Sequence, residues 1–128
     1  MSQELNAGRV FIVDDELIIA STLATILQRN GYDATSFNKP VNALEAARAK
    51  APDLIISDVV MPVLSGIELA IQVRSFCPAC KILLFSGQTS TENLLRDAQN
   101  SGHNFELLSK PIPPTEFLKH IKNVIAEK

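Results

Sequence analysis

Short apolar runs alternate along the chain with segments in which apolar residues recur at helical spacing. Four of these runs are too short for helices and indicate buried strands, at 10–13, 54–56, 82–85 and 107–108. A weaker run at 34–37 predicts a strand near an edge of the sheet. Because strands that are apolar throughout are typical of parallel sheets covered on both faces, the pattern predicts an α/β fold.

Helical periodicity fills the intervals between the runs. Apolar residues at 20, 23, 24 and 27 predict a first helix, with Gly31 at its C′ position, and Asn38 is expected to be the N-cap of a second helix that continues through Lys50. Further helices are predicted around 66–73, over 89–100 and from Pro113 onward. The last of these should bury one face, made of Phe117, Ile121, Val124 and Ile125. The repeated β-α order predicts a single domain over 1–128, with a core of about 9–126 and no output domain.

Composition and charge narrow the class of protein. Hydrophobic residues make up 46% of the chain and aromatic residues only 5%, so the core should be mainly aliphatic. The formal net charge is −2 and there is no basic stripe, which argues against direct nucleic-acid binding. The first residues are polar and no apolar run is long enough to cross a bilayer, so we expect a cytoplasmic protein without membrane contact.

Cys77 and Cys80 form a Cys-Pro-Ala-Cys string. A redox motif of this kind works at a helix N-terminus, where the helix dipole stabilises a thiolate. Here the string follows a predicted helix and precedes a strand, so we expect two incidental thiols at a helix-to-strand turn.

Polar residues follow the predicted strands at the points where ligands bind in open α/β sheets. Asp14 and Asp15 follow the first strand, Asp58 the third, Ser86 the fourth and Lys110 the fifth. Each residue has an ordinary alternative role, such as a helix cap for Asp14 or Asp15, a turn for Ser86 and a solvated side chain for Lys110. These separate roles would not explain why three acids, a hydroxyl and a lysine all follow strands at the same edge of the sheet. Taken together, the residues therefore favour one functional site.

Three clustered carboxylates repel one another, and a bound divalent cation relieves the repulsion. Oxygen ligands suit Mg²⁺, and the absence of His and Cys from these segments argues against zinc. A carboxylate beside Mg²⁺ can attack phosphorus and form an acyl phosphate. Lys110 and the Ser86 hydroxyl would then contact the transferring phosphoryl oxygens.

Four motifs in order carry a family resemblance: VDDE at 13–16, DVVMP at 58–62 with Ser65, Gly66 and Glu68 after it, LFSG at 84–87 and LSKP at 108–111. From Arg9 to about Ala126 the chain resembles the response-regulator receiver domains of two-component signalling. The resemblance implies a flavodoxin-like (βα)5 doubly wound sheet of order 2-1-3-4-5, with helices on both faces. It also implies a signalling switch that depends on Mg²⁺, with Mn²⁺ as a substitute metal. The domain would not be an enzyme: it would assist only its own phosphorylation and its own dephosphorylation. The phosphoryl donor would be a histidine kinase or histidine phosphotransfer protein, and the receiver of the signal an unknown downstream protein or output domain.

The same resemblance implies a role for each site residue. Asp58 corresponds to the phosphoacceptor, and Asp14 and Asp15 to the acid pair, with Asp15 nearest the metal. The backbone carbonyl of Val60 corresponds to a further metal ligand. Ser86 and Lys110 correspond to the switch hydroxyl and the phosphate-binding lysine.

Two features depart from the family pattern. The interval from Gly102 to Lys110 is one residue longer than usual, and the position three residues before the lysine usually holds an aromatic residue. Leu107 occupies this position, and Phe105 lies two residues upstream. The switch would therefore act either through Phe105 or, as we favour, through a backbone shift of 87–91 next to Ser86. Two further side chains, Val60 and Gln88, are expected to influence the rate of dephosphorylation.

Three rival functions fit the residues less well. An aspartyl-phosphate phosphatase needs a second acid two residues after the nucleophile, where this chain has Val60. A flavin module needs a phosphate-binding loop after the first strand, and the acids at 14–16 would repel phosphate. The intact acids and lysine argue against a receiver that works without phosphorylation. His103 and His120 are expected to be surface residues rather than phosphorelay histidines.

Overall fold

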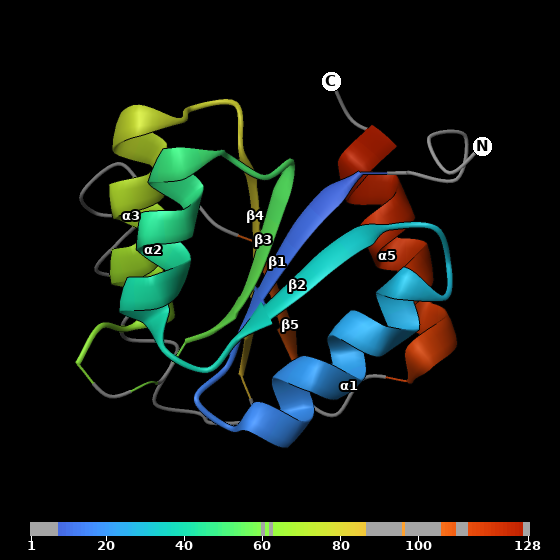
Figure 1. Ribbon diagram of the computed structural model, residues 1–128. Helices are drawn as coiled ribbons and strands as arrows, with labels where there is room; N and C mark the ends of the chain where they lie inside the picture. Colours follow the sequence, from blue (N-terminus) through green and yellow to red (C-terminus); the bar gives the residue numbers. More distant parts are fainter. Residues whose placement is uncertain are drawn as a thin grey trace.

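The computed structural model describes residues 8–59, 61, 63–86, 96, 106–109 and 113–126. The described residues form five parallel strands in the order β2-β1-β3-β4-β5, together with four helices (Figure 1). In chain order the elements are β1 (Arg9–Val13), α1 (Leu17–Gln28), β2 (Asp33–Phe37), α2 (Pro40–Ala49), β3 (Leu54–Asp58), α3 (Gly66–Phe76), β4 (Lys81–Ser86), β5 (Glu106–Ser109) and α5 (Pro114–Ala126). The predicted fold and strand order are confirmed, while the helix predicted over 89–100 lies outside the described residues apart from Arg96.

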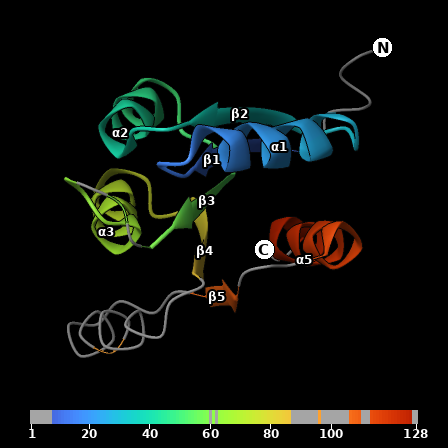
Figure 2. The same cartoon turned by 90° about the horizontal axis from the view of Figure 1, so that it is seen from below.

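The sheet places the helices in two outer layers. Figure 2 shows α2 and α3 on one face of the sheet and α1 and α5 on the other. Side chains of β1 alternate between these layers: Val10 and Ile12 pack in a core with α1 and α5, whereas Phe11 and Val13 pack in a core with α2 and α3. Because both faces are covered, the strand is apolar throughout.

Two further predictions are also confirmed, one of an edge strand and one of the buried face of the last helix. β2 is an edge strand, which agrees with its weaker apolar pattern. On α5, Phe117 and Ile121 are fully buried and Val124 nearly so, and Ile125 packs against the same core. The Phe117 ring meets the Phe85 ring of β4 edge to face, with centroids 6.2 Å apart.

Two predictions of helix ends are wrong. The N-cap of α2 is Lys39, which makes no side-chain cap hydrogen bond, and not Asn38. Pro40 begins this helix instead, since its fixed φ suits the first helical turn and its missing N–H costs nothing there. At the end of α1 the C-cap is Arg29, so the C′ residue is Asn30, and Gly31, with φ +90°, lies one residue beyond it.

The start of β1 lies beside the end of α5, at the end of the sheet where the strands begin (Figure 1). The carbonyl oxygen of Gly8 accepts a hydrogen bond from the Asp33 N–H at 2.9 Å. A Cβ atom at Gly8 would lie 3.2 Å from Cδ1 of Ile125. Since all strands are parallel, their carboxyl ends meet at the opposite edge.

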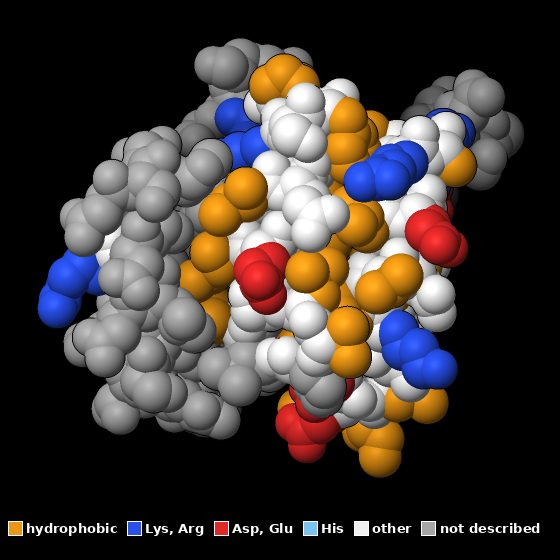
Figure 3. Space-filling view, turned by 90° about the vertical axis from the view of Figure 1, so that its left-hand side faces the viewer, with side chains coloured by type: hydrophobic (Ala, Val, Ile, Leu, Met, Phe, Trp, Pro, Cys, Tyr) orange, Lys and Arg blue, Asp and Glu red, His pale blue; other side chains and the backbone are white. Residues whose placement is uncertain are grey.

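Apolar side chains lie among charged ones on the outer face formed by α2 and α3 (Figure 3). Val41 and Phe76 are the large apolar residues exposed on these two helices. The Arg48 guanidinium carbon lies 5.5 Å from the centroid of the Phe76 ring, a cation–π contact between α2 and the end of α3. None of the helices among the described residues has the length and apolar character that a membrane span requires.

Candidate functional site

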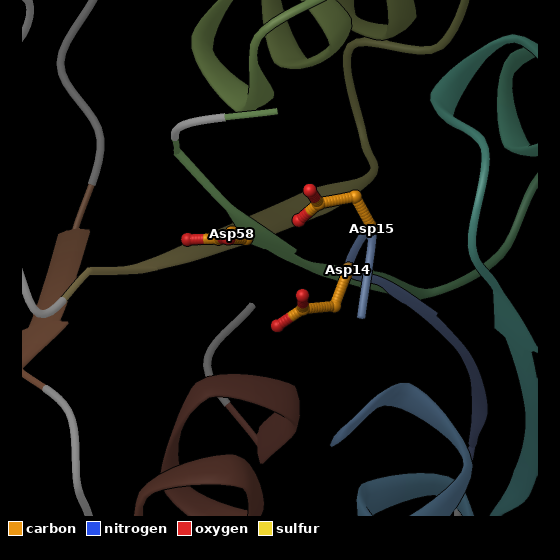
Figure 4. A group of neighbouring side chains, drawn as sticks. All are labelled: Asp14, Asp15 and Asp58. Atoms are coloured by element: carbon orange, nitrogen blue, oxygen red, sulfur yellow. The ribbon is translucent and has the colours of Figure 1, made fainter. Parts of the chain in front are cut away.

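Three carboxylates converge at the carboxyl edge of the sheet (Figure 4). Asp14 and Asp15 come directly after β1, and Asp58 ends β3, which pairs with β1. One oxygen from each carboxylate lies within 4.8 Å of the others. The convergence of the three acids that was predicted from their positions after strands is therefore confirmed.

The three acids differ in exposure. Asp14 is 1% exposed, Asp58 is partly buried and Asp15 is exposed. The backbone holds Asp14 on both sides, since its N–H donates to the Phe37 carbonyl at 3.1 Å and its Oδ1 accepts from the Glu16 N–H at 2.9 Å. The N-cap of α1 is Glu16 and makes no side-chain cap bond, so neither Asp14 nor Asp15 is the N-cap of that helix.

The donor set fits a small hard cation. Mg²⁺ binds oxygen ligands at about 2.1 Å, so opposite ligands of one ion lie about 4.2 Å apart. The separation of up to 4.8 Å among the three carboxylate oxygens is close to this span. At an effective dielectric constant of about 20, two unit charges at this distance repel by roughly 3 kcal/mol, and less where solvent screens Asp15. A divalent cation would reverse the sign of this interaction.

The backbone of Asp58 is packed against the first residue of α3. A Cβ atom at Gly66 would lie 2.1 Å from the Asp58 carbonyl oxygen and 3.0 Å from the Ser57 hydroxyl oxygen. The Gly66 N–H donates to the Val59 carbonyl at 2.9 Å, and the buried Ser57 hydroxyl donates to the Asp58 carbonyl at 2.9 Å. Only glycine leaves room for this approach, so Gly66 and Ser57 position the backbone that carries the Asp58 carboxylate.

A capping box fixes the start of α3 at this contact. The Ser65 hydroxyl accepts from the Glu68 N–H at 3.1 Å, and the Glu68 carboxylate accepts from the Ser65 N–H at 2.9 Å. The Ser-x-x-Glu spacing is a recognised signal of a helix start. From the sequence these residues were recognised only as part of a family motif, and their capping role was missed.

The loop between β3 and α3 contains a strained residue. Val63 has φ +73° and is 92% exposed. A β-branched residue in the left-handed region costs about 1–2 kcal/mol, and residues that hold such strain cluster near functional sites. Nearby anchors hold the loop, because Met61 is buried in the core beneath α2 and α3 and Ser65 caps α3.

The remaining predicted site residues are described in part or not at all. The backbone of Ser86 ends β4 and pairs with Ser109 of β5, but its side chain is outside the described part. Lys110, Val60, Gln88, Phe105 and His103 also lie outside it. Leu107 is partly buried and packs on the α3 side of the sheet with Val59, Ile67 and Leu84 among others, whereas Leu108 packs on the α1 and α5 side. His120 of α5 is partly exposed, and its ring contacts the Glu106 carboxylate of β5.

Together, fold and site define a doubly wound parallel α/β domain with an acid cluster at the carboxyl edge of its sheet. Residues 10–122 match the family model of the response regulator receiver domain, so the chain belongs to this family. It is thus a receiver domain of two-component systems and a signalling switch, as the motifs predicted.

Similar proteins agree with this assignment. The chain is 29% identical over 116 residues to the transcriptional regulatory protein CreB of Escherichia coli, covering 91% of this chain and 50% of that protein. It is 29% identical over 117 residues to the alkaline phosphatase synthesis transcriptional regulatory protein PhoP of Bacillus subtilis, covering 91% of this chain and 48% of that protein. The chain thus spans about half the length of these curated relatives.

Two solved structures match over nearly their full length. The chemotaxis protein CheY4 of Vibrio cholerae is 32% identical with a TM-score of 0.79, covering 91% of this chain and 97% of that one. A CheY-like response regulator receiver domain protein of Methanospirillum hungatei is 26% identical with a TM-score of 0.82, and the match covers 91% of this chain and 92% of that one.

Proposed function

We propose that Asp58 accepts a phosphoryl group from a phosphohistidine on a histidine kinase or histidine phosphotransfer protein. The observation that supports this most directly is the meeting of Asp58 with Asp14 and Asp15 within 4.8 Å at the carboxyl edge of the sheet. A carboxylate oxygen of Asp58 forms the new bond to phosphorus, and the bond between phosphorus and the donor nitrogen breaks. Asp58 is suited to this role because it ends the central strand and remains partly exposed, whereas Asp14 is buried.

The acid cluster is proposed to bind Mg²⁺, with Mn²⁺ as a substitute. Asp14, Asp15 and Asp58 would supply carboxylate oxygens, and Val60 would supply its backbone carbonyl. When bound, the ion neutralises charge on the transferring phosphoryl oxygens. We also propose that the Lys110 ammonium group and the Ser86 hydroxyl contact the phosphoryl oxygens, because both residues occupy the corresponding positions in the family motifs.

Phosphorylation is proposed to change a protein-binding surface. Ser86 would move toward the phosphoryl group, and the change would spread through the segment 87–91 or through Phe105. Leu107 supports a role for backbone movement, since it packs in the core on the α3 side and has no polar tip to change partners. The downstream partner would be another protein or an output domain, and we propose that the exchange takes place in the cytoplasm.

The metal proposal is tested by two variants that each remove one negative charge. Asp15→Asn should weaken Mg²⁺ binding about tenfold, or ~1.4 kcal/mol, because it removes an oxygen ligand. Glu16→Gln is the matched control and should change the affinity far less, since Glu16 is exposed and is not part of the three-carboxylate cluster. The chain has no Trp, so calorimetry, with and without beryllofluoride, is the suitable measurement. Equal losses in the two variants would contradict the assigned ligands.

Self-dephosphorylation is expected to be modest, because Val60 cannot hydrogen-bond an attacking water. Val60→Asn or Val60→Glu, and separately Gln88→Ala, should change the decay rate of the phosphoprotein several-fold. The rate is measured by removing the phosphoryl donor and following the phosphorylated band on a phosphate-affinity gel. Val41→Asn on α2 is the matched control, since Val41 is exposed and belongs to none of the family motifs. If all the Val60 and Gln88 variants decayed at the wild-type rate, these side chains would not influence the water that attacks the phosphoryl group.

A further inference from the structure

Cys77 and Cys80 lie at the two ends of a tight turn between α3 and β4. Cys77 is the C-cap of α3, and its N–H donates to the Val73 carbonyl at 2.8 Å. The Cys80 N–H donates to the Cys77 carbonyl at 3.2 Å, which closes a four-residue turn with Pro78 at its second position. The α-carbons at the ends of such a turn lie within about 7 Å, and disulfides commonly bridge α-carbons about 4.4–6.8 Å apart.

Both cysteines pack against the same part of the core. Cys80 is 3% exposed and belongs to the core beneath α2 and α3, and the partly buried Cys77 packs against the same core. Burial, and after it the neighbouring Cys77, raise the pKa of the Cys80 thiol to about 12. Both cysteines are free thiols. The turn therefore brings together two reduced cysteines, of which Cys77 is partly exposed and Cys80 is buried.

The predicted place of the pair, at a helix-to-strand turn, is confirmed. Because the pair follows the end of a helix, it lacks the helix N-terminus that stabilises the thiolate of a catalytic dithiol. A rapid redox catalyst needs a stabilised thiolate, whereas a slow regulatory disulfide needs only two thiols within reach and an oxidant. Proline at the second position favours the turn in the unfolded and reduced chain as well. The backbone turn thus already holds the two cysteines three residues apart at its two ends.

We propose that Cys77 and Cys80 are a redox modification site, at which a small-molecule disulfide such as oxidised glutathione closes a reversible disulfide across the α3–β4 turn. The Cys77 thiolate attacks one sulfur of the small disulfide, whose S–S bond breaks and releases one small thiol. The Cys80 thiol then loses its proton and attacks the Cys77 sulfur, which releases the second small thiol. Two protein thiols are oxidised and one small disulfide is reduced to two thiols.

Burial decides the order of these steps. Cys77 is the more exposed of the two residues, so it forms the mixed disulfide, and the buried Cys80 resolves it. The high pKa of Cys80 slows the second step, but its fixed position beside Cys77 makes the attack intramolecular. The thiol of Cys80 makes only a weak contact with the Lys81 carbonyl, at 3.5 Å, so little bonding is lost when its proton leaves.

Treatment of the full chain with oxidised glutathione, followed by intact-mass measurement and alkylation of free thiols, tests this proposal. The wild-type protein should lose two hydrogen atoms, become resistant to alkylation and carry no glutathione. Its melting temperature should rise by a few degrees and return after reduction, because the bridge restricts the unfolded chain. The wild-type measurement does not depend on the folding of any variant.

Matched variants identify the order of attack. Cys80→Ala should stop with one glutathione attached to Cys77, and Cys77→Ser should leave the buried Cys80 unmodified. A wild-type protein that stops as a glutathione adduct, keeps both thiols, or forms a dimer linked between chains would overturn the proposal.

Discussion

Asp58→Asn should eliminate the phosphoprotein that forms with acetyl phosphate and Mg²⁺. The change keeps the size of the side chain but replaces the attacking carboxylate with an amide, which is a poor nucleophile toward phosphorus. Asp14 should not substitute, because it is 1% exposed and one of its oxygens already accepts a backbone N–H. The measurement is the shifted, acid-labile band on a phosphate-affinity gel.

Asp33→Asn is the matched control for this experiment. Asp33 is an exposed aspartate at the first residue of β2, at the end of the sheet away from the acid cluster. The control should be phosphorylated at the wild-type rate. A labile band of full strength in Asp58→Asn would show that another residue accepts the phosphoryl group.

Gly66→Ala should both destabilise the fold and slow phosphorylation of Asp58. Alanine normally stabilises a helix relative to glycine by up to about 1 kcal/mol, so the expected sign is opposite to helix propensity. The added methyl group would lie 2.1 Å from the Asp58 carbonyl oxygen, and the backbone must shift to accept it. Overpacking of this kind costs about 1–3 kcal/mol or more. Urea unfolding measures the loss of stability, and the rate of phosphorylation by acetyl phosphate measures the displacement of Asp58.

A double variant separates the two contacts of the added methyl group. Ser57→Ala removes the hydroxyl oxygen that would lie 3.0 Å from it, together with the hydrogen bond to the Asp58 carbonyl, but leaves the carbonyl oxygen that would lie 2.1 Å from it. Gly66→Ala combined with Ser57→Ala should therefore remain as slow as Gly66→Ala alone. Recovery of wild-type activity in the double variant would assign the clash to the hydroxyl instead of the backbone of the acceptor.

The sequence predicts the sheet and the acid cluster well because both depend on simple regularities. Apolar runs such as 10–13 have the length of a strand, and β1 is buried on both faces. Parallel strands bring their carboxyl ends to one edge, so Asp14, Asp15 and Asp58 had to meet once the strands were assigned. No side-chain packing needs to be known for this inference.

Features that depend on contacts between distant residues were harder to predict. Asn38 is a good capping residue by type, yet Pro40 sets the start of α2, and the N-cap is one residue later. The approach of Gly66 to Asp58 joins the end of a strand to the start of a helix across a loop, and nothing in local propensity reveals it. Val63 is a poor residue for its backbone conformation, so local preference would have predicted a different loop.

The position of Gly8 beside Ile125, at the amino end of the sheet, has a consequence for how this domain can be combined with others. Asp14, Asp15 and Asp58 lie at the opposite edge, about the length of one strand away. A segment joined ahead of β1 or behind α5 would start from the far side of the domain, where it leaves the approach to the acids open. Fusion at either side is therefore compatible with access of a phosphoryl donor, so the same switch can be attached to different proteins without redesign of its reactive edge.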